Sequence, residues 1–346
     1  MQQLLTNIRI QQVTNSTVVA RRVIIICVLI IISSCDTLDS KRTKMQPNKA
    51  SFEVMRLSEN PIITPDKNPG IGDNVNGPSL IKVPGWIPNP LGRYYLYFAH
   101  HNGKYIRLAY SQSLGGPYKV HGPGTLKLRQ TVCIDHIASP DIYVDMKKLE
   151  IRMYFHCPVK DKSGQHTFYA VSKDGLNFTA NQEILGKSYF RIFQHDGYFY
   201  ALALGGALYR SRTGLTMFQE GKNPFAQNGE TEIRHLAVKV NGSVLKVFYS
   251  RIGDKPERIL ISTIDMSVGW SRWRATSPVT ILKPEKVYEG VDLPITASIG
   301  GAAQGRVREL RDPAIYHERD KTYLLYTVAG ESGIAISEYK ESKPNQ

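Results

Sequence analysis

The chain has few acidic residues for its length. Its 346 residues include 44 lysines and arginines but only 30 aspartates and glutamates, which gives a formal net charge of +14. This excess favours anionic neighbours such as sulfated or uronic polysaccharides and lipid headgroups, while a basic surface that serves only solubility is the alternative. No dense run of lysine and arginine, recognition helix or zinc spacing accompanies the charge. We therefore expect no nucleic-acid partner.

Cysteine is scarce as well. Cys27 and Cys35 lie near the N-terminus, and only Cys133 and Cys157 remain in the rest of the chain. Their spacing matches no zinc-binding pattern and the histidines show no metal-ligand spacing, so we expect no metal and no cofactor. In an oxidising compartment Cys133 and Cys157 can pair, and two free buried thiols are the alternative.

The first 35 residues contain no acidic residue. A basic flank precedes an apolar run at residues 23–32 that is too short to span a bilayer well by itself, a pattern typical of an export signal. Ile32-Ser33-Ser34-Cys35 resembles a bacterial lipobox, which predicts lipidation of Cys35 and a membrane anchor at the cell envelope, on its periplasmic or cell-surface side. An uncleaved signal anchor is the alternative. The polar residues 36–55 predict a flexible tether.

Beyond the tether, no stretch shows a helical stripe of three turns, and a strand pattern returns five times instead. Aromatic strands occupy residues 94–98, 151–155, 198–202, 245–249 and 323–326, and third strands follow at 108–111, 169–172, 208–211, 260–263 and 334–337. A lone blade cannot bury both faces, whereas radial stacking can, so the pattern predicts an all-β fold, a five-bladed β-propeller over residues 56–341. A β-sandwich is the alternative. The connection at residues 266–307 is unusually long, and long loops in compact domains are often functional.

The inner strand of every propeller blade starts near the central axis, so polar residues at these starts should converge on one pocket. The starts fall at residues 76–80, 138–143, 188–192, 231–236 and 310–316. Acids, arginines and a histidine recur among them.

Three short motifs at or near these positions resemble those of the five-bladed propeller glycoside hydrolases of families 43, 32 and 117. They are Ser139-Pro140-Asp141, Arg311-Asp312-Pro313 and Tyr288-Glu289-Gly290. The resemblance implies a general base, an orienting carboxylate and a general acid. In family 43 the Arg-Asp-Pro motif opens the first blade, whereas here it opens the last, and Glu289 lies in the long connection.

Glycoside hydrolysis needs one carboxylic acid to protonate the leaving oxygen and one carboxylate to activate water or attack the sugar. Asp312 or Asp141 is assigned as base or orienting group, and Glu232 or Glu289 as acid. The predicted substrate contacts are Asn76, His136, Arg191, Arg234, His235 and Arg311. The alternatives are that an aspartate beside proline only caps a turn, that Glu232 only pairs with Arg234, and that Glu289 is a solvated loop acid.

The sequence therefore predicts a glycoside hydrolase-like protein that cleaves a poly- or oligosaccharide, anionic ones included. A non-catalytic carbohydrate-binding lipoprotein is the alternative, and a propeller that only binds proteins is a third hypothesis.

Overall fold

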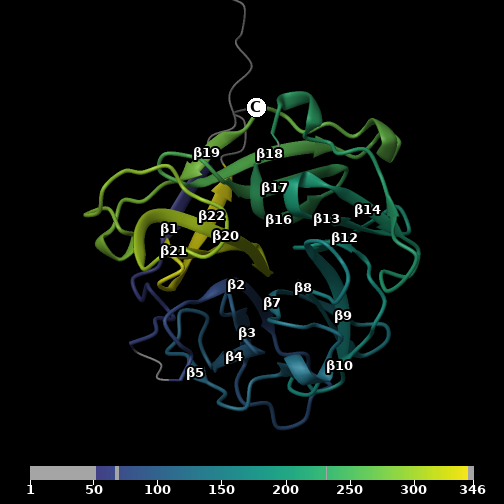
Figure 1. Ribbon diagram of the computed structural model, residues 1–346, viewed down its shortest axis with the longest axis horizontal. Coiled ribbons are helices and arrows are strands. Elements are labelled where there is room, and N and C mark those ends of the chain that lie inside the picture. Colours follow the sequence, from purple (N-terminus) through teal and green to yellow (C-terminus); the bar gives the residue numbers. More distant parts are fainter. Residues whose placement is uncertain (1–51, 67–69, 231, 342–346) are drawn as a thin grey trace, which may run out of the picture. The chain divides into compact units, whose positions relative to one another are not determined.

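The computed structural model describes residues 52–66, 70–230 and 232–341. Five antiparallel sheets form a ring (Figure 1), which confirms the five-bladed β-propeller. Blade I comprises β2 (Asn76–Lys82), β3 (Tyr94–Ala99), β4 (Tyr105–Ser111), β5 (Lys119–Val120) and β6 (Leu126–Lys127). Blade II comprises β7 (Ala138–Asp145), β8 (Glu150–Pro158), β9 (Gln165–Ser172), β10 (Thr179–Ala180) and β11 (Gly186–Lys187).

The remaining blades have four strands each. Blade III comprises β12 (Arg191–His195), β13 (Tyr198–Leu202), β14 (Leu208–Ser211) and β15 (Gln219–Glu220). Blade IV comprises β16 (Ile233–Asn241), β17 (Val244–Arg251), β18 (Ile259–Asp265) and β19 (Val279–Leu282). Blade V comprises β20 (Arg306–Glu318), β21 (Lys321–Gly330), β22 (Ile334–Glu341) and β1 (Phe52–Arg56).

Helical structure in the described residues is confined to five short 3₁₀ segments. They are η1 (Leu128–Gln130), η2 (Leu204–Gly206), η3 (Ala226–Asn228), η4 (Trp270–Arg272) and η5 (Val287–Glu289). No helix in the described part of the chain is long and apolar enough to cross a membrane.

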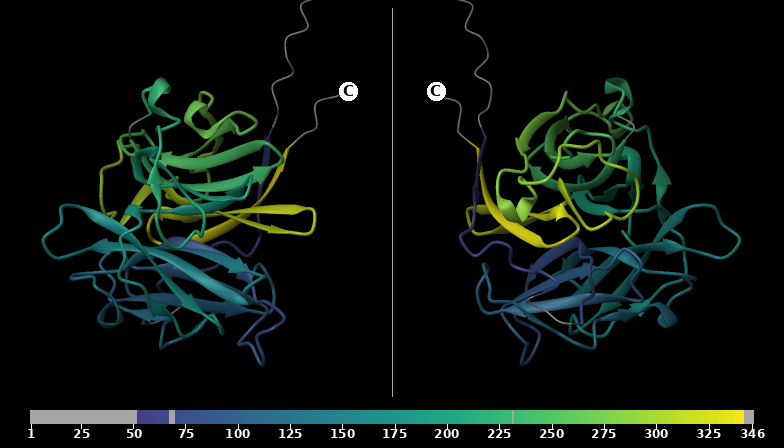
Figure 2. Two further views of the ribbon diagram at one scale, coloured as in Figure 1. Left: turned by 90° about the vertical axis from the view of Figure 1, so that its right-hand side faces the viewer. Right: turned by 60° about the vertical axis from the view of Figure 1, so that its left-hand side comes forward.

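Strand β1 joins the two ends of the propeller. It pairs antiparallel with β22, from Phe52 opposite Glu341 to Arg56 opposite Ser337, and Figure 2 shows the two strands side by side at the edge of blade V. Its residues alternate between half-buried and exposed, with Phe52 and Val54 packed inward. The tether predicted for residues 36–55 therefore ends too late, because residues 52–55 belong to the sheet. The rest of that tether, the predicted signal segment and Cys35 lie outside the described residues.

The hydrophobic core is divided into five clusters, one between each pair of neighbouring blades. The second strands supply both sides, because successive side chains point to opposite faces of a sheet. In β3, Tyr95 and Tyr97 pack toward blade II while Leu96 and Phe98 pack toward blade V. Burial on both faces explains why these strands read as continuous aromatic runs, and each large apolar side chain removed from water stabilises the fold by about 1.5–3 kcal/mol.

A disulfide joins Cys133 to Cys157, with the two Cα atoms 5.7 Å apart. Cys157 lies near the end of β8, opposite His166 of β9. The bridge thus fixes the segment that leads into β7 to the neighbouring strand of the same blade, and it selects the disulfide from the two states that the sequence left open.

Candidate functional site at the propeller axis

The inner strand of each blade begins with an irregularity at the same place. In four blades the pairing with the second strand skips two residues, namely Gly77-Pro78, Ser139-Pro140, Arg234-His235 and Asp312-Pro313. Bulges of this kind re-aim side chains, and proline fits them because it has no N–H to give to the sheet. In blade III, Tyr189 stands two residues before the start of β12 and has a φ of 67°, in the left-handed region that Gly77, Ser139 and Asp312 also adopt.

These positions contribute one residue from each blade to a set of contacts at the axis, the axial set of Gly77, Ser139, Tyr189, His235 and Asp312. Ser139 Oγ lies 3.1 Å from His235 Nε2, although blades II and IV are not neighbours in the ring. His235 Nδ1 contacts the Asp312 carboxylate, and the Gly77 N–H donates to the other oxygen of that carboxylate over 3.3 Å. The inner strands therefore meet side chain to side chain at the centre.

Tyr189 lies between two imidazoles. Its ring centroid is 3.9 Å from that of His235 and 4.1 Å from that of His156, and both pairs are close to perpendicular. Burial lowers the pKa of His156 and of His235 well below the ordinary value, and neighbouring cationic groups add to the effect. Both imidazoles are therefore neutral near pH 7, so they act as hydrogen-bonding groups rather than as charges.

Two buried arginines and three buried glutamates form a second group, the axial cluster of Arg234, Arg311, Glu257, Glu309 and Glu331. Arg234 donates two hydrogen bonds to Glu257, of 2.9 and 3.1 Å. Arg311 donates to Glu309 over 2.6 Å and also lies 3.6 Å from Glu257 and 3.6 Å from Glu331. Three carboxylates thus share two guanidiniums, an arrangement that tolerates burial because each charge has a partner.

The long connection predicted to be functional lies over this cluster. The carbonyl of Gly301 accepts hydrogen bonds from Arg234 over 3.2 Å and from Arg311 over 3.1 Å. The same segment is fixed to blade IV, since Gly253 N–H donates to the Ser298 carbonyl and Ser298 N–H donates to the Asp254 carbonyl. Its backbone therefore helps to hold both arginines in place.

The environments of Glu309 and Glu331 move their pKa values in opposite directions. Burial raises the pKa of Glu309 and the nearby charge of Glu257 adds to this, although Arg311 opposes it. Burial also acts to raise the pKa of Glu331, but contacts with His101 and Asn74 and the charge of Arg311 outweigh it and lower the pKa. One carboxyl is thus biased toward its protonated form and the other toward its ionised form.

Tyr189 connects the axial set to the axial cluster. Burial raises its pKa to about 12, and the charges of Arg234, Glu331 and Arg311 act on the same hydroxyl. Tyr189 is only partly buried, unlike the other members of the axial set. It is therefore the member of that set that a ligand can reach most readily.

Two of the predicted site residues tie neighbouring blades together. The Asp141 carboxylate accepts the Ile192 N–H over 2.9 Å and lies 3.4 Å from the Arg191 guanidinium. Arg191 also donates to the carbonyls of Leu236 and Pro140. Burial raises the pKa of Asp141, although Arg191 opposes the shift. These contacts connect the inner strands of blades II, III and IV.

The structure does not bring Glu289 to the axis. Glu289 is fully buried beside β1, the strand of blade V farthest from the axis, where Arg56 donates to both of its carboxylate oxygens. The Tyr326 hydroxyl and the backbone N–H groups of Glu285 and Lys286 also donate to it. Its motif resembles that of a catalytic acid, but its contacts are those of a group that fastens β1 to the blade.

The remaining predicted residues lie around the axis. Glu232 is exposed directly before β16. His136 is buried, with Nδ1 3.0 Å from Asp135 and Nε2 3.3 Å from Gln165. Asn76 is buried, and its side-chain oxygen has no hydrogen-bond partner among the described residues. A buried polar atom of this kind is a candidate for contact with a bound molecule.

The sequence motifs did not identify Tyr189, Glu257, Glu309 and Glu331 as site residues. Glu309 carried a usable signal, since it stands two residues before Arg311 and strand residues at this spacing share a face. Glu257 and Glu331 lie in turns after second strands and match no motif. The described residues contain no group of three or more histidine, cysteine, aspartate or glutamate side chains arranged to hold a metal ion.

Comparison with solved structures places the fold among carbohydrate-active propellers. A glycoside hydrolase of family 130 that targets β-1,2-mannosidic linkages in Candida mannan aligns with a TM-score of 0.62 at 12% identity, covering 87% of this chain and 97% of that one. A family 43 β-xylosidase/α-arabinofuranosidase from a compost metagenome, solved with xylotriose, gives 0.56 at 14% identity, covering 85% and 96%. At such identities the likeness establishes the five-bladed glycoside hydrolase-like fold, which confirms the architecture that the sequence resemblance implied.

Sequence comparison gives a nearer relative. No family model matches the chain. The uncharacterized protein R118 of Acanthamoeba polyphaga mimivirus is 38% identical over 324 residues, which cover 84% of this chain and 91% of that protein. The chain therefore belongs to the same family as this mimivirus protein and has the fold of the five-bladed propeller glycoside hydrolases.

Proposed function

We propose that the protein hydrolyses a glycosidic bond of a poly- or oligosaccharide at the end of the axis where the inner strands begin. The observation that carries this proposal is the axial cluster, in which Glu309 and Glu331 share the Arg311 guanidinium while their pKa values are shifted in opposite directions. Paired carboxyl groups whose environments separate their pKa values are the arrangement that acid–base catalysis requires.

The contacts with Arg311 also limit how far apart the two carboxyls can be. The distances of 2.6 Å to Glu309 and 3.6 Å to Glu331, together with the width of the guanidinium, keep the nearest oxygens within about 8.5 Å of each other. Glycosidases place their two carboxyls roughly 5–9.5 Å apart. This upper limit overlaps the range that glycosidases use.

In this proposal Glu309 is the general acid and Glu331 the base or nucleophile. Asp312 is the orienting carboxylate, acting through His235 and the Gly77 N–H. Arg234, Arg311, Asn76 and Tyr189 contact the substrate. Asp141 and Arg191 position the inner strands through their contacts between blades.

The test is turnover on a panel of neutral and acidic glycans, measured as the release of reducing ends. Glu309→Gln and Glu331→Gln should each lower kcat at least about 100-fold on any glycan that is hydrolysed, because positioned proton transfer contributes 10²–10⁴-fold. The exposed Glu285→Gln, which makes the same chemical change near blade V, is the matched control. If both axial variants keep the turnover of the unchanged protein, the assignment of roles is wrong.

A non-catalytic carbohydrate-binding protein is the second candidate. It is favoured by the closed pairing of the cluster, since Glu257, Glu309 and Glu331 are all buried and all lie against arginine. This function predicts that glycans bind at the axis and are recovered intact, and that Glu309→Gln changes affinity only. Detection of hydrolysis products that the two axial variants abolish would remove it.

A lipid anchor at the cell envelope is a separate proposal, supported by the composition of residues 1–35 and by the lipobox-like segment ending at Cys35. Mass spectrometry of the mature protein should find an N-terminal diacylated or triacylated Cys35, and Cys35→Ser should release the protein from the membrane fraction. An unmodified N-terminus that begins upstream of Cys35 would contradict it.

A further inference from the structure

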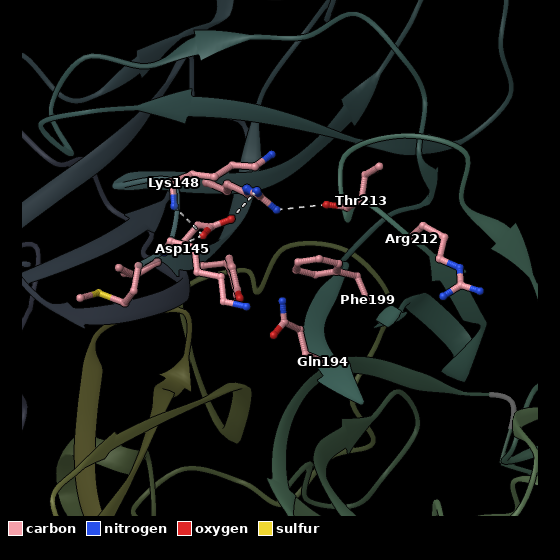
Figure 3. A pocket seen from close by; sticks show the side chains of 11 residues that line it. Asp145, Lys148, Gln194, Phe199, Arg212 and Thr213 are labelled. Carbon is pink, nitrogen blue, oxygen red and sulfur yellow. Dashed lines mark hydrogen bonds and ion pairs between the residues drawn. The ribbon is translucent and has the colours of Figure 1, made fainter. Parts of the chain in front are cut away.

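A cleft of about 540 Å³ lies between blades II and III, and Figure 3 shows it from close by. Its walls come from the turn between β7 and β8, the last residues of β12, the start of β13 and the segment that follows β14. Strand β7 starts at the axial set and reaches the cleft at its far end. Asp145 lies six positions after Ser139, about 20 Å along an extended strand, so the cleft is distinct from the proposed active site.

The lining of this cleft, here called the blade II–III cleft, is strongly basic. It contains four cationic side chains, namely Lys147, Lys148, Arg152 and Arg212, and the single carboxylate of Asp145. Asp145 is already engaged, because it pairs with Arg152 and accepts the backbone N–H groups of Lys147 and Lys148 over 3.0 and 3.1 Å. The cleft therefore has an excess of positive charge with no free carboxylate in its lining.

Arg152 acts as a fixed wall rather than a free ligand. It is almost fully buried, donates to Glu150 over 3.0 Å and to the Thr213 carbonyl over 3.2 Å, and pairs with Asp145. The other three cations are exposed. No ion pair within the described residues joins Lys147, Lys148 or Arg212 to a carboxylate, and Arg212 packs over the Tyr198 ring at 3.8 Å.

Aromatic and amide groups complete the site. The Phe199 ring is directed into the cleft beside the Gln194 amide (Figure 3). The ring is held from behind, since a Cβ at Gly214 would lie 2.7 Å from its carbon atoms, and Tyr143 packs against it at 5.6 Å, nearly perpendicular. A rigid, partly exposed ring beside an amide and several cations offers apolar contact for the C–H groups of a sugar, a hydrogen-bonding group for a hydroxyl and partners for an anion.

We infer that the blade II–III cleft is a second saccharide-binding site, selective for sugar chains that carry sulfate or carboxylate groups. Its volume lies within the 300–1,000 Å³ typical of small-ligand pockets and suits a few sugar units. The inference does not depend on hydrolysis at the axis, because it uses none of the residues of the axial set or the axial cluster.

The experiment is calorimetric titration of the whole protein with a sulfated tetrasaccharide, a tetramer of galacturonic acid and a neutral cello-tetraose, at low and at physiological salt. The double variant Lys147→Glu/Lys148→Glu should raise the Kd for an acidic tetramer at least about tenfold, and added salt should weaken binding to the unchanged protein. Which of the two acidic tetramers binds shows whether the cleft recognises sulfate or carboxylate groups. Cello-tetraose should bind far more weakly than either.

The matched control is Lys222→Glu/Arg272→Glu, which reverses the same charge at exposed positions outside the cleft. It should leave the Kd within about twofold, because neither side chain lines the cleft. Phe199→Leu separates a sugar site from a simple anion site. It should weaken binding of the acidic tetramer but leave any binding of inorganic sulfate unchanged.

Three results would overturn the inference. They are equal loss of affinity in the cleft variant and the matched control, absence of binding of both acidic tetramers to the unchanged protein, and a dependence on Lys147 and Lys148 that appears only with anionic lipid vesicles or single-stranded DNA. Thermal unfolding of each variant shows whether the fold is retained. If the axial variants lose hydrolysis but still bind acidic tetramers at the cleft, this inference stands. If hydrolysis is intact but the cleft does not bind acidic tetramers, this inference is wrong and the proposed hydrolysis is unaffected.

Discussion

Replacing Gly77 with alanine tests the close approach of the inner strands at the axis. A Cβ at this position would lie 2.5 Å from the Ser139 Cα atom and 2.8 Å from Ser139 Oγ. Carbon atoms in contact prefer about 3.5–4.0 Å, so the two strands would have to separate by about 1 Å. Overpacking of this kind costs about 1–3 kcal/mol. The left-handed φ of 54° adds about 1–2 kcal/mol for a residue with a side chain.

The expected loss of folding free energy is therefore about 3 kcal/mol, or about 5 °C in Tm for a domain of this size. Gly242→Ala is the matched control, because Gly242 has a φ of 57° but no atom within 4 Å of the added Cβ. Thermal unfolding of both variants should show the larger loss for Gly77→Ala, and the difference measures the steric clash alone. Equal losses would refute the close packing of Gly77 against Ser139.

Three further predictions concern pH, the disulfide and strand β1. His156 and His235 have lowered pKa values in the folded protein, so only the unfolded chain takes up protons at these two residues as pH falls below about 6.5. The free energy of unfolding should then fall by up to about 1.4 kcal/mol per pH unit for each histidine. Denaturant titrations should show a smaller slope with pH for His156→Gln. The bridge between Cys133 and Cys157 closes a loop of 24 residues, so the double Cys→Ser variant should lose about 3 kcal/mol, and an unchanged unfolding midpoint would argue against the disulfide. Glu289→Gln should cost about 3 kcal/mol, because it removes the charge of a fully buried carboxylate that pairs with the half-buried Arg56, whereas Glu285→Gln, at the exposed partner of Arg56, should cost under 1 kcal/mol.

The fold was largely predictable because each blade repeats the same local pattern of aromatic strands, third strands and turn residues. The aromatic second strands and the third strands fall within β3, β8, β13, β17 and β21 and within β4, β9, β14, β18 and β22. The five predicted inner-strand starts coincide with the beginnings of β2, β7, β12 and β16 and with the bulge in β20. Alternation and turn residues determine all of these without reference to distant parts of the chain.

Strand β1 could not be predicted in the same way. Phe52 pairs with Glu341, a partner almost 290 positions away, and its own segment has only five residues. Its strand conformation is a consequence of the free edge that β22 offers, which exists only after β20, β21 and β22 have paired.

The candidate site was predictable only in part. Arg234, His235, Arg311 and Asp312 were identified because they stand at inner-strand starts, where topology alone brings residues together. Glu257 and Glu331 escaped because their position depends on how turns after second strands fold over the axis. Glu289 was identified from a motif that resembles that of a catalytic acid, but Arg56 and Tyr326 hold its carboxylate beside the outer strand.

The pH dependence of kcat/KM on a hydrolysed glycan tests catalysis by the axial cluster most directly, because it reports the protonation states of the acid and the base in the free enzyme. If Glu309 is the acid and Glu331 the base, the profile should be bell-shaped. Its acidic limb, set by the lowered pKa of Glu331, should disappear in Glu331→Gln, and its alkaline limb, set by the raised pKa of Glu309, should disappear in Glu309→Gln. Residual activity in both variants that keeps both limbs unchanged would contradict catalysis by the axial cluster.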